Sequence, residues 1–580
     1  MAGLVNPDPD FWYGRRVLVT GHSGFKGGWL GLWLARLGAV PLGLSLPAQD
    51  EAEGERLGFL GSIMPGVACD IRDGQAVQAA LKQFAPEIVL HLAAQPLVRR
   101  SYRDPHLTFE TNVMGTLNLL EAVRLQASGD YIALLDHDDM LAPHAFHAFA
   151  EAINRHPQAD WLYSDEDKID EASRRSAPFF KPDWSPAYFL SCMYSCHLGV
   201  YRTSLARQLG GFRPDYDFAQ DYDLALRFAR ATRQIVHVPD ILYHWRTLPQ
   251  STASGGEAKP QAELAARRAV QDFVDRSPYR GSVLPGPLPG THRVRFDITG
   301  DPLVSIAIPT AGYRSDDGRS WYVLDLIRSI HALTTYAHIE IVVAENGDLA
   351  PELEQALRDL GARLVRYESE VFNLSDKINR LAEATRGDIL LLLNDDMRII
   401  SRGWIEEMLM WCQQDGISGV GAKLFFPDGR IQHAGVLLLG QGPSHPYYLH
   451  PASEIGQVCS AVVPRDYSAV TGACMMVRRA DFLAVGGFDP AYRINYNDID
   501  FCMRLNVHTG GHFVFTPYAC LEHHESVSRP EPEAGELDRF NRQWASAIGR
   551  DPFYNPNLSQ TSARFALTTD PRSLAETYGL

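Results

Sequence analysis

Two runs of carboxylates each follow an apolar stretch that begins with Gly-Asp. The first is GDYIALLDHDDML, which presents Asp136, Asp138 and Asp139, and the second is GDILLLLNDDMRI, which presents Asp395 and Asp396. Carboxylates this close repel one another, and the usual compensation is a hard divalent cation bound to oxygen ligands. A helix N-cap is the simpler interpretation of an aspartate that precedes an amphipathic helix. The carboxylate spacing alone leaves both interpretations open.

The motifs around these runs recur in the same order. GGFRPDYDFAQDYDLALR matches GGFDPAYRINYNDIDFCMR, and LYHWR matches LEHHE, so that Asp221 aligns with Asp498 and His244 with His523. Taken singly, Asp221 would be a solvated helix residue and His244 a core histidine. Two ordered copies of one motif set indicate an internal repeat rather than chance acidic pairs. The repeat therefore favours a functional interpretation of the carboxylates.

The repeated motifs resemble family 2 glycosyltransferases, which have the GT-A fold. In that family the DxD strand carries the metal and the nucleotide, a later acidic motif supplies the base, and a histidine completes the metal shell. For the first copy the resemblance implies metal binding by Asp138 and His244, substrate binding by Asp136 and catalysis by Asp221. This copy lacks the VSIIIP-like strand and the two βα units that grip the nucleotide base. It is expected to be a truncated transferase segment.

The second copy has the missing opening at DPLVSIAIPTAG. Strands and helices then alternate up to GDILLLLNDDMRI, which is the α/β nucleotide-binding pattern. The segments AKLFFPDGRIQHAGV, PRDYSAVTGACMMVRRADF and DPFYNPNLS strengthen the resemblance to transferases of bacterial surface polysaccharides. The resemblance thus implies a complete family 2 domain.

The chemistry of sugar transfer explains the residue types in this second copy. Moving a sugar from a nucleoside diphosphate requires neutralising the departing diphosphate and deprotonating an acceptor hydroxyl. The resemblance assigns a divalent ion, Mn²⁺ or Mg²⁺, to Asp396 and His523, with His524 as a substitute for the histidine. Asp498 is the expected base. Attack from the face opposite the leaving group would invert the anomeric configuration.

Further substrate contacts are implied by the same resemblance. Thr310 and Glu345 fall where the family contacts the nucleotide base and ribose, and Glu345 stands where Asp is more usual. Asn394 and Asp395 are expected towards the ribose or the second shell of the ion. Asp500 is expected to be structural or to face the acceptor.

The N-terminal segment carries a different set of motifs. RRVLVTGHSGFKGGWLGLWLARLGA combines a β-branched strand, a glycine turn and an amphipathic helix, and Gly21, Gly24 and Gly27 let the backbone approach a pyrophosphate. With HLAAQPLVRRSY and TNVMGTLNLLEAVR, residues 1–125 resemble the N-terminal half of extended short-chain dehydrogenases, nearest to the CDP-glucose 4,6-dehydratases. The resemblance implies NAD at the glycine loop, which includes Phe25, and places Asp70 near the adenine. No acidic residue closes the second strand, VPLGLSL, so the usual ribose carboxylate is missing.

The catalytic half of such a dehydratase is absent. These enzymes need a Tyr-x-x-x-Lys pair, in which the lysine lowers the pKa of the tyrosine so that it can shuttle a proton. None of the lysines in the sequence has a tyrosine four residues earlier. The alternative function is therefore a catalytically incomplete, dehydratase-like protein that binds NAD. A third alternative, a glycan- or nucleotide-binding module with a dead site, is weakened by the intact LNDD and NDID motifs.

Together the motifs predict an α/β chain with three parts. Residues 1–125 form a Rossmann-like half domain, 126–290 a partial GT-A domain and 291–580 a complete GT-A domain, with the linker at the Pro- and Gly-rich SPYRGSVLPGPLPGTH. Both families build a doubly wound sheet. We therefore expect the helix EAVRLQ to be followed by YIALLD as the next strand of one hybrid sheet.

The composition of the chain restricts which binding partners and which cellular location we expect. A net charge of -16 argues against a general binder of nucleic acid or anionic membranes. The eight cysteines include no CxxC pair and are expected to be reduced thiols of a cytoplasmic protein. No stretch approaches the ~20 apolar residues of a membrane span, and the N-terminus lacks the features of a signal peptide, so any membrane contact is expected to be peripheral, at the inner face.

The sequence thus predicts a metal-dependent inverting glycosyltransferase. Its expected partners are a nucleotide-sugar donor and a glycan or lipid-linked glycan acceptor. It is expected to act through its C-terminal domain in the assembly of O-antigen, capsule or a related surface polysaccharide.

Overall fold

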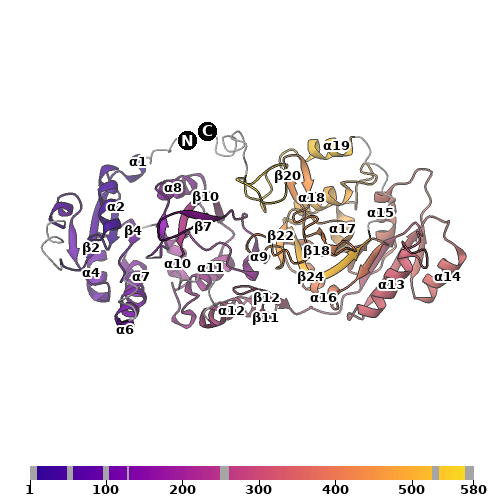
Figure 1. Ribbon diagram of the computed structural model, residues 1–580, viewed down its shortest axis with the longest axis horizontal. Coiled ribbons are helices and arrows are strands. Elements are labelled where there is room, and N and C mark those ends of the chain that lie inside the picture. The colour runs from indigo at the N-terminus through magenta and orange to yellow at the C-terminus, as the bar shows by residue number, and fades with distance from the viewer. Residues whose placement is uncertain are drawn as a thin grey trace. The chain divides into compact units, whose positions relative to one another are not determined.

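The computed structural model describes residues 9–48, 57–95, 103–126, 130–136, 138–247, 260–524 and 535–567. The chain divides into two units (Figure 1). The first unit contains Met1–Lys181 and Ser195–Phe273, and the second contains Pro182–Tyr194 and Val274–Leu580. Neither unit boundary coincides with the predicted limits at 125 and 290, and the three-domain division stays a prediction.

The first unit begins with a four-stranded parallel sheet in the order β3-β2-β1-β4. Its strands are β1 (Arg16–Thr20), β2 (Val40–Ser45), β3 (Gly66–Ala68) and β4 (Ile88–His91). Successive side chains of a strand point to opposite faces. Val17 and Val19 accordingly pack with Leu34 of α2 (Phe25–Arg36), whereas Leu18 packs with the helices α4 (Gly74–Phe84) and α7 (Gly115–Gln126) on the other face. This is the predicted doubly wound half domain.

A separate sheet follows in the same unit. Its strands are β5 (Tyr131–Ala133), β6 (Met140–Leu141), β7 (Trp161–Ile169), β8 (Arg175–Phe179), β9 (Gly199–Arg202) and β10 (Ile235–Arg246). They run in the order β5-β9-β7-β10-β6, with β8 paired to β7. The prediction of one hybrid sheet is wrong, because β5 pairs with β9 and, among the described residues, forms no ladder with β4. Apolar side chains of β4 and of the segment around β5, such as Leu90 and Leu135, instead line a shared cavity of about 370 Å³.

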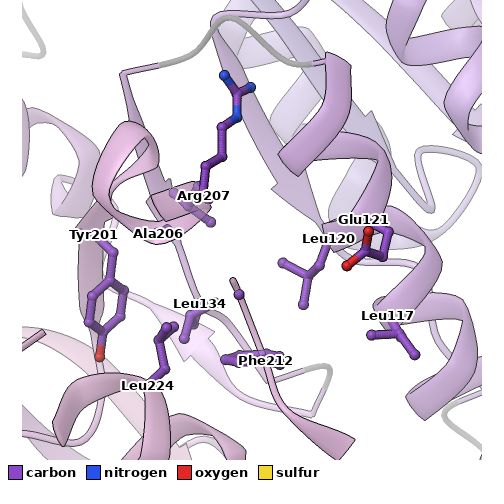
Figure 2. Close-up of a pocket in the computed structure, with 11 residues that line it drawn as sticks. Leu117, Leu120, Glu121, Leu134, Tyr201, Ala206, Arg207, Phe212 and Leu224 are labelled. Carbon is purple, nitrogen blue, oxygen red and sulfur yellow. The ribbon is translucent and has the colours of Figure 1, made fainter. Parts of the chain in front are cut away.

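The two sheets of the first unit have separate cores but are nevertheless in contact through side chains. Ile132 of β5 packs against the cluster that contains Leu119 of α7, and the Arg207 Nη2 donates to the carbonyl of Val123 at 2.9 Å. Figure 2 shows the small cavity of about 40 Å³ at this junction, with Leu120 of α7 among its lining residues. Side-chain packing, rather than strand pairing, thus connects the dehydratase-like sheet to the sheet of the first transferase copy.

The second unit is built on one large mixed sheet in the order β15-β14-β13-β16-β23-β18-β24-β17. These strands are β13 (Val304–Pro309), β14 (Ile339–Glu345), β15 (Arg363–Arg366), β16 (Ile389–Leu393), β17 (Met397–Ile399), β18 (Ile417–Phe425), β23 (Cys474–Arg478) and β24 (His512–His523). Two short strands extend it, β19 (Ile431–His433) on β18 and β22 (Arg465–Tyr467) on β24. The principal helices are α13 (Tyr322–Leu333), α14 (Pro351–Asp359), α15 (Leu374–Ala384), α16 (Trp404–Cys412), α17 (Arg479–Ala484), α18 (Asn497–Thr509) and α19 (Glu536–Gln543).

The internal repeat is present in the strand order. The path β5-β9-β7-β10-β6 of the first unit has the same sequence of parallel and antiparallel pairings as β16-β23-β18-β24-β17 of the second. The second unit places β15, β14 and β13 before this path, whereas the described part of the first unit's sheet begins at β5. The strand order confirms the predicted repeat, and the truncation of its first copy stays a prediction.

A short segment from the middle of the first copy belongs to the second unit. Its helix α9 (Pro186–Ser191) lies beside β22 (Figure 1). Asp466 of β22 is fully buried and accepts hydrogen bonds from the Ser185 Oγ at 2.5 Å and the Ala187 backbone N–H at 2.8 Å. Its other oxygen lies 2.7 Å from His512 Nε2. The segment that the sequence assigned to the truncated transferase therefore completes the packing of the other unit.

Replacing Asp466 with Ala is expected to lower the free energy of unfolding of the second unit by about 3 kcal/mol, because the change strands several buried donors at once. Ser185→Ala, which removes one donor, should cost about 1 kcal/mol. Urea unfolding of the full chain, followed by tryptophan fluorescence, measures both changes. The matched control is Asp428→Ala in an exposed turn, which should leave the midpoint unchanged. Equal unfolding midpoints for Asp466→Ala and Asp428→Ala would mean that the hydrogen bonds of Asp466 do not stabilise the second unit.

None of the helices that the structure describes combines the length and the apolar character needed to cross a bilayer.

Candidate active site

The second unit contains a cavity of about 420 Å³ at the carboxyl ends of β13 and β16. In open α/β sheets this is the edge where ligands bind. Six of the residues predicted from the sequence line it, namely Thr310, Asn394, Asp395, Asp396, Asp498 and His523. Residues distant in the sequence therefore meet in one hollow.

The predicted metal ligands of the second copy lie together. Strand pairing sets Met397 opposite His523, which brings the His523 Nε2 to 3.1 Å from the Asp396 Oδ1, and both side chains are buried. The Gln432 Oε1 lies 2.5 Å from the Nδ1 of His523. An amide oxygen only accepts, so the proton is on Nδ1 and the Nε2 lone pair of a neutral His523 faces a carboxylate.

That arrangement suits a divalent cation placed between the imidazole and the carboxylate. One nitrogen and one carboxylate donor are compatible with Mn²⁺ or Mg²⁺. Clusters of at least three His, Cys, Asp or Glu side chains able to hold an ion occur, within the described ranges, at Glu166–Cys196–His197 and Asp136–Asp139–His197. Both of these clusters lie in the first unit, so the Asp396–His523 pair supplies two candidate ligands and is not part of a three-residue cluster.

The residues at the end of β13 form a charged network. The Thr310 hydroxyl donates to the Asp395 Oδ2 at 2.5 Å. Burial, reinforced by Asp396, raises the pKa of Asp395 to about 6. The buried Lys377 donates from Nζ to the Thr310 carbonyl at 2.6 Å and to the Asn346 Oδ1 at 2.8 Å. Burial lowers the pKa of Lys377 to about 8, partly offset by nearby carboxylates that include Asp395. Lys377 is therefore a buried amino group at the Thr310 side of the cavity, and the sequence had not indicated it.

Glu345 has a less direct position. It closes β14, is buried and accepts a hydrogen bond from the Gly347 backbone N–H. It is not among the residues that line the cavity. Its carboxylate contributes to the negative charge around Lys377 instead.

Asp498, the predicted base, is held at the cavity wall by backbone donors. Its Oδ2 accepts from the Gly472 N–H at 2.8 Å and its Oδ1 from the Ile499 N–H at 2.9 Å. The nearby Asp500 is fully buried and accepts from the Arg504 Nε at 2.7 Å. Of the two alternatives for Asp500, the structural one is therefore correct, and Asp498 is the carboxylate that the cavity exposes.

The corresponding residues of the first copy are arranged differently. Burial raises the pKa of Asp221, which begins α11 (Gln220–Ala231). The His244 Nδ1 lies 2.5 Å from the Oδ1 of Asp167 on β7. Here the histidine that matches His523 is thus paired with a carboxylate outside the DxD segment.

Strand register also changes which aspartate corresponds to Asp396. Ala133 pairs with Val200 as Leu391 pairs with Met476, and His244 pairs with Met140 as His523 pairs with Met397. Between these two anchors the first copy has one extra residue. Asp139, directly before Met140, therefore occupies the position of Asp396, although the sequence alignment pointed to Asp138.

The carboxylate of Asp139 is engaged by its own chain. The hydroxyl of Tyr243 and the backbone N–H of Arg246 donate to its two oxygens, the latter at 2.7 Å, and the side chain is buried. Burial raises the pKa of Asp139 to about 6. Asp136, by contrast, is exposed and lies 3.8 Å from His197, a neighbour that the sequence did not indicate. In the first copy, Asp139 is thus hydrogen-bonded to Tyr243 and to the backbone of Arg246.

The glycine loop of the first unit has the geometry of a dinucleotide cradle. Gly21 has φ +71°, and a Cβ there would lie 2.8 Å from the Ala93 nitrogen. A Cβ on Gly27 would lie 2.4 Å from the Gly21 carbonyl, and Gly24 caps α2. Only glycines permit this close approach, and the loop fits a pyrophosphate at the start of α2. Phe25 is exposed beside it.

Asp70 is the remaining residue predicted near NAD. Its carboxylate accepts from the Arg72 Nη2 at 2.6 Å, and this hydrogen bond lowers its pKa. An adenine or ribose contact by Asp70 stays a prediction.

Two family models match separate parts of the chain. Residues 18–135 match GDP-mannose 4,6 dehydratase, and residues 305–482 match Glycosyl transferase family 2. Both resemblances inferred from the sequence are confirmed. The dehydratase match runs past residue 125 and ends just after β5.

Curated proteins match the chain over different lengths. The chain is 37% identical over 499 residues to the uncharacterized protein y4gI of Sinorhizobium fredii, covering 83% of this chain and 53% of that protein. It is 36% identical over 452 residues to the O-antigen biosynthesis protein RfbC of Myxococcus xanthus, covering 76% and 35%. It is 49% identical over 117 residues to the CDP-glucose 4,6-dehydratase of Salmonella typhimurium, covering 20% and 33%. The chain thus spans about half or less of the length of these relatives.

Proposed function

We propose that the chain is a metal-dependent, inverting glycosyltransferase that moves a sugar from a nucleotide-sugar donor to a glycan acceptor. The observation that carries the proposal is the cavity of the second unit, whose walls contain both the Asp396–His523 pair and the Asp498 carboxylate. The family 2 match over residues 305–482 supports it.

In this proposal the donor binds at the ends of β13 and β16. Lys377 and the Thr310–Asp395 pair shape the nucleotide end of the cavity. A divalent ion held by Asp396 and His523 would neutralise charge on the departing diphosphate. Gln432 keeps the Nε2 lone pair of His523 available for that purpose.

Asp498 takes the proton of the acceptor hydroxyl as that oxygen attacks the anomeric carbon. The new carbon–oxygen bond forms while the bond to the diphosphate oxygen breaks, and the electron pair leaves with the diphosphate. Because attack and departure occur on opposite faces of the sugar, the anomeric configuration inverts. The Gly472 and Ile499 backbone N–H groups hold the carboxylate in place for this transfer.

The biological setting belongs to the same proposal. A relative named for O-antigen biosynthesis supports a surface glycan as the acceptor class. No disulfide links the eight cysteines, all of which lie among the described residues, and this supports a reducing compartment such as the cytoplasm. The first unit then acts chiefly as a scaffold. Its glycine loop supports a second candidate function, the binding of NAD, without the rest of a dehydratase.

The test is nucleoside diphosphate release by the full chain with UDP-, GDP-, dTDP- and CDP-sugars. We expect release from one nucleotide class with Mn²⁺, stimulation by an oligosaccharide acceptor, and about a 100-fold loss when EDTA removes the metal. Full activity in EDTA would contradict metal dependence. Failure of every nucleoside diphosphate to bind, together with binding of NAD, would favour the second candidate function.

A further inference from the structure

The first unit contains a cluster of three chemically different side chains that could bind a metal ion. Glu166 lies on β7, and Cys196 and His197 directly precede β9. One donor atom of each, a carboxylate oxygen, a thiol sulfur and an imidazole nitrogen, lies within 4.8 Å of the other two. These are the three kinds of ligand that Zn²⁺ takes in proteins, whereas Mg²⁺ and Ca²⁺ prefer oxygen alone.

The distances within the cluster match ligands of one tetrahedral ion. The Nδ1 of His197 lies 3.4 Å from the Glu166 Oε2, and the Sγ of Cys196 lies 4.0 Å from the same oxygen. Zinc bonds of about 2.1 Å to nitrogen and oxygen and about 2.3 Å to sulfur place tetrahedral ligands about 3.4 and 3.6 Å apart. The first separation therefore fits as it stands, and the second needs only a small rotation of the Cys196 side chain.

The imidazole of His197 has a buried nitrogen that lacks a hydrogen bond. Its Nδ1 is inaccessible to solvent and makes no hydrogen bond with any residue that the structure describes. The ring stacks on Tyr243, with 4.6 Å between ring centroids, and contacts Trp245. An unsatisfied buried polar atom is costly, and a metal ion would supply the missing partner.

Asp136 favours the tautomer that a metal needs. Its carboxylate lies 3.8 Å from the Nε2 of His197, on the side of the ring away from Glu166. A carboxylate there favours the proton on Nε2 and leaves the lone pair on Nδ1, as is usual for histidines that bind metals.

Lys181 fixes the loop that carries two of the three ligands. Its buried Nζ donates to the Glu166 Oε2 at 3.0 Å, to the His197 carbonyl at 2.7 Å and to the Cys196 carbonyl. The loop is therefore held against β7 before any ion binds. With Asp136 nearby, the negative charges of Glu166 and a Cys196 thiolate still outweigh the ammonium group, so the cluster suits a cation.

A proton competes with a metal ion for this place. Burial disfavours a charged His197, but Cys196 and Glu166 outweigh it and raise the pKa of His197 well above its ordinary value. Groups that stabilise one positive charge beside Nδ1 also stabilise a divalent ion, and such binding releases protons.

The second copy of the repeat lacks these ligands. The register that aligns β9 with β23 makes Cys196 and His197 the counterparts of Gly472 and Ala473, whose side chains cannot bind a metal. The cluster is therefore a property of the first copy alone and does not repeat the metal pair proposed for the second unit.

His197 also belongs to a cluster with Asp136 and Asp139. That set is less suited to an ion, because Asp139 already accepts hydrogen bonds from the Tyr243 hydroxyl and the Arg246 backbone N–H, and Asp136 is exposed. The cluster that contains Cys196 is the better supported of the two.

We propose that Glu166, Cys196 and His197 bind a Zn²⁺ ion in the first unit, with a water molecule as the fourth ligand. Cys196 binds as the thiolate, and its proton passes to solvent. The ion would connect the loop before β9 to β7 and stabilise the first unit. The proposal goes beyond the proposed function and does not depend on it.

The test uses Co²⁺ as a spectroscopic substitute for Zn²⁺ in the full chain, after removal of metals with a chelator. A thiolate ligand gives Co²⁺ a sulfur-to-metal charge-transfer absorption in the near ultraviolet, which nitrogen and oxygen ligands do not give. We expect this band in the unmodified chain and its disappearance when Zn²⁺ displaces Co²⁺. Cys196→Ser should abolish the band, and Cys459→Ser, which changes a partly buried cysteine of the second unit, should keep it.

Zn²⁺ affinity gives the second measurement. Competition with a chromogenic chelator should show binding weakened about 100-fold or more in Cys196→Ser and in His197→Gln, because loss of even an outer partner of a metal ligand costs about 10–100-fold. Zn²⁺ should also raise the thermal unfolding midpoint of the unmodified chain, but not that of Cys196→Ser. Circular dichroism verifies that each variant is folded.

Three results would overturn the zinc site. They are the absence of the charge-transfer band in the unmodified chain, an equal band in Cys196→Ser, and loss of the band in Asp396→Asn, which changes the proposed transferase site instead. The first of these would mean that the cluster holds only a proton. Sugar transfer is not measured in this test, so a failure of the proposed function would leave its outcome unaffected.

Discussion

Asp498→Asn is expected to lower the kcat of sugar transfer about 1,000-fold, the scale of losing a general base. The Kd for the nucleoside diphosphate with Mn²⁺ should change little, because Asp498 is held by Gly472 and Ile499 and is separate from the Asp396–His523 pair. The asparagine has nearly the same shape and can still accept a backbone hydrogen bond. Steady-state kinetics and calorimetry of the same preparation separate the two effects.

The repeat supplies the control for this experiment. Asp221 aligns with Asp498, begins the equivalent helix and is buried enough for its pKa to be raised. Because His244 of this copy is paired with Asp167 rather than with the DxD segment, Asp221→Asn should leave kcat unchanged. The opposite pattern, with activity lost in Asp221→Asn and kept in Asp498→Asn, would place the reaction in the first unit.

The common location of residues that belong to ordered motifs could be predicted from the sequence. Asp396, His523 and Asp498 each follow a recognisable strand or precede a recognisable helix, and the sheet brings the ends of those elements to one edge. The same reasoning identified the glycine loop, since Gly21 needs a backbone that a Cβ would obstruct. The local sequence was sufficient to locate these residues because a single strand, helix or turn positions each of them.

Residues whose roles depend on register or on distant packing could not be predicted. DHDD and NDD can be aligned in two ways, and the pairing of Met140 with His244 is needed to identify Asp139 as the counterpart of Asp396. Lys377 lies on α15, where the sequence showed no sign of a functional lysine, yet it is buried and donates to the Thr310 carbonyl.

The prediction that β5 continues the first sheet was wrong for a related reason. Compatible folds on both sides of residues 121–141 suggested a shared ladder, but β5 comprises only Tyr131–Ala133 and pairs with β9. Hydrophobic contacts can join two sheets without matching their backbone registers, as Ile132 does against the first core. Sequence patterns report which faces are apolar but not which edge a short strand joins.

The register argument leads to an experiment that compares the two copies. Asp396→Asn is expected to weaken Mn²⁺-dependent binding of the nucleoside diphosphate about 100-fold, since it removes a charged ligand beside His523. His523→Gln should have a comparable effect, because the lone pair that Gln432 orients is lost. Titration of Mn²⁺ at fixed nucleotide measures both changes.

Asp139→Asn is the matched substitution in the first copy. The hydroxyl of Tyr243 and the Arg246 N–H already occupy the carboxylate, so its loss should lower the free energy of unfolding by about 1–2 kcal/mol without weakening metal-dependent binding. A loss of metal-dependent binding in Asp139→Asn, together with retention in Asp396→Asn, would mean that the cluster of Asp136, Asp139 and His197 holds the ion. Besides the three additional strands of the second unit, the copies differ in how they use the equivalent carboxylate. Asp139 is hydrogen-bonded by its own chain, whereas Asp396 lies 3.1 Å from the Nε2 of His523 at the cavity.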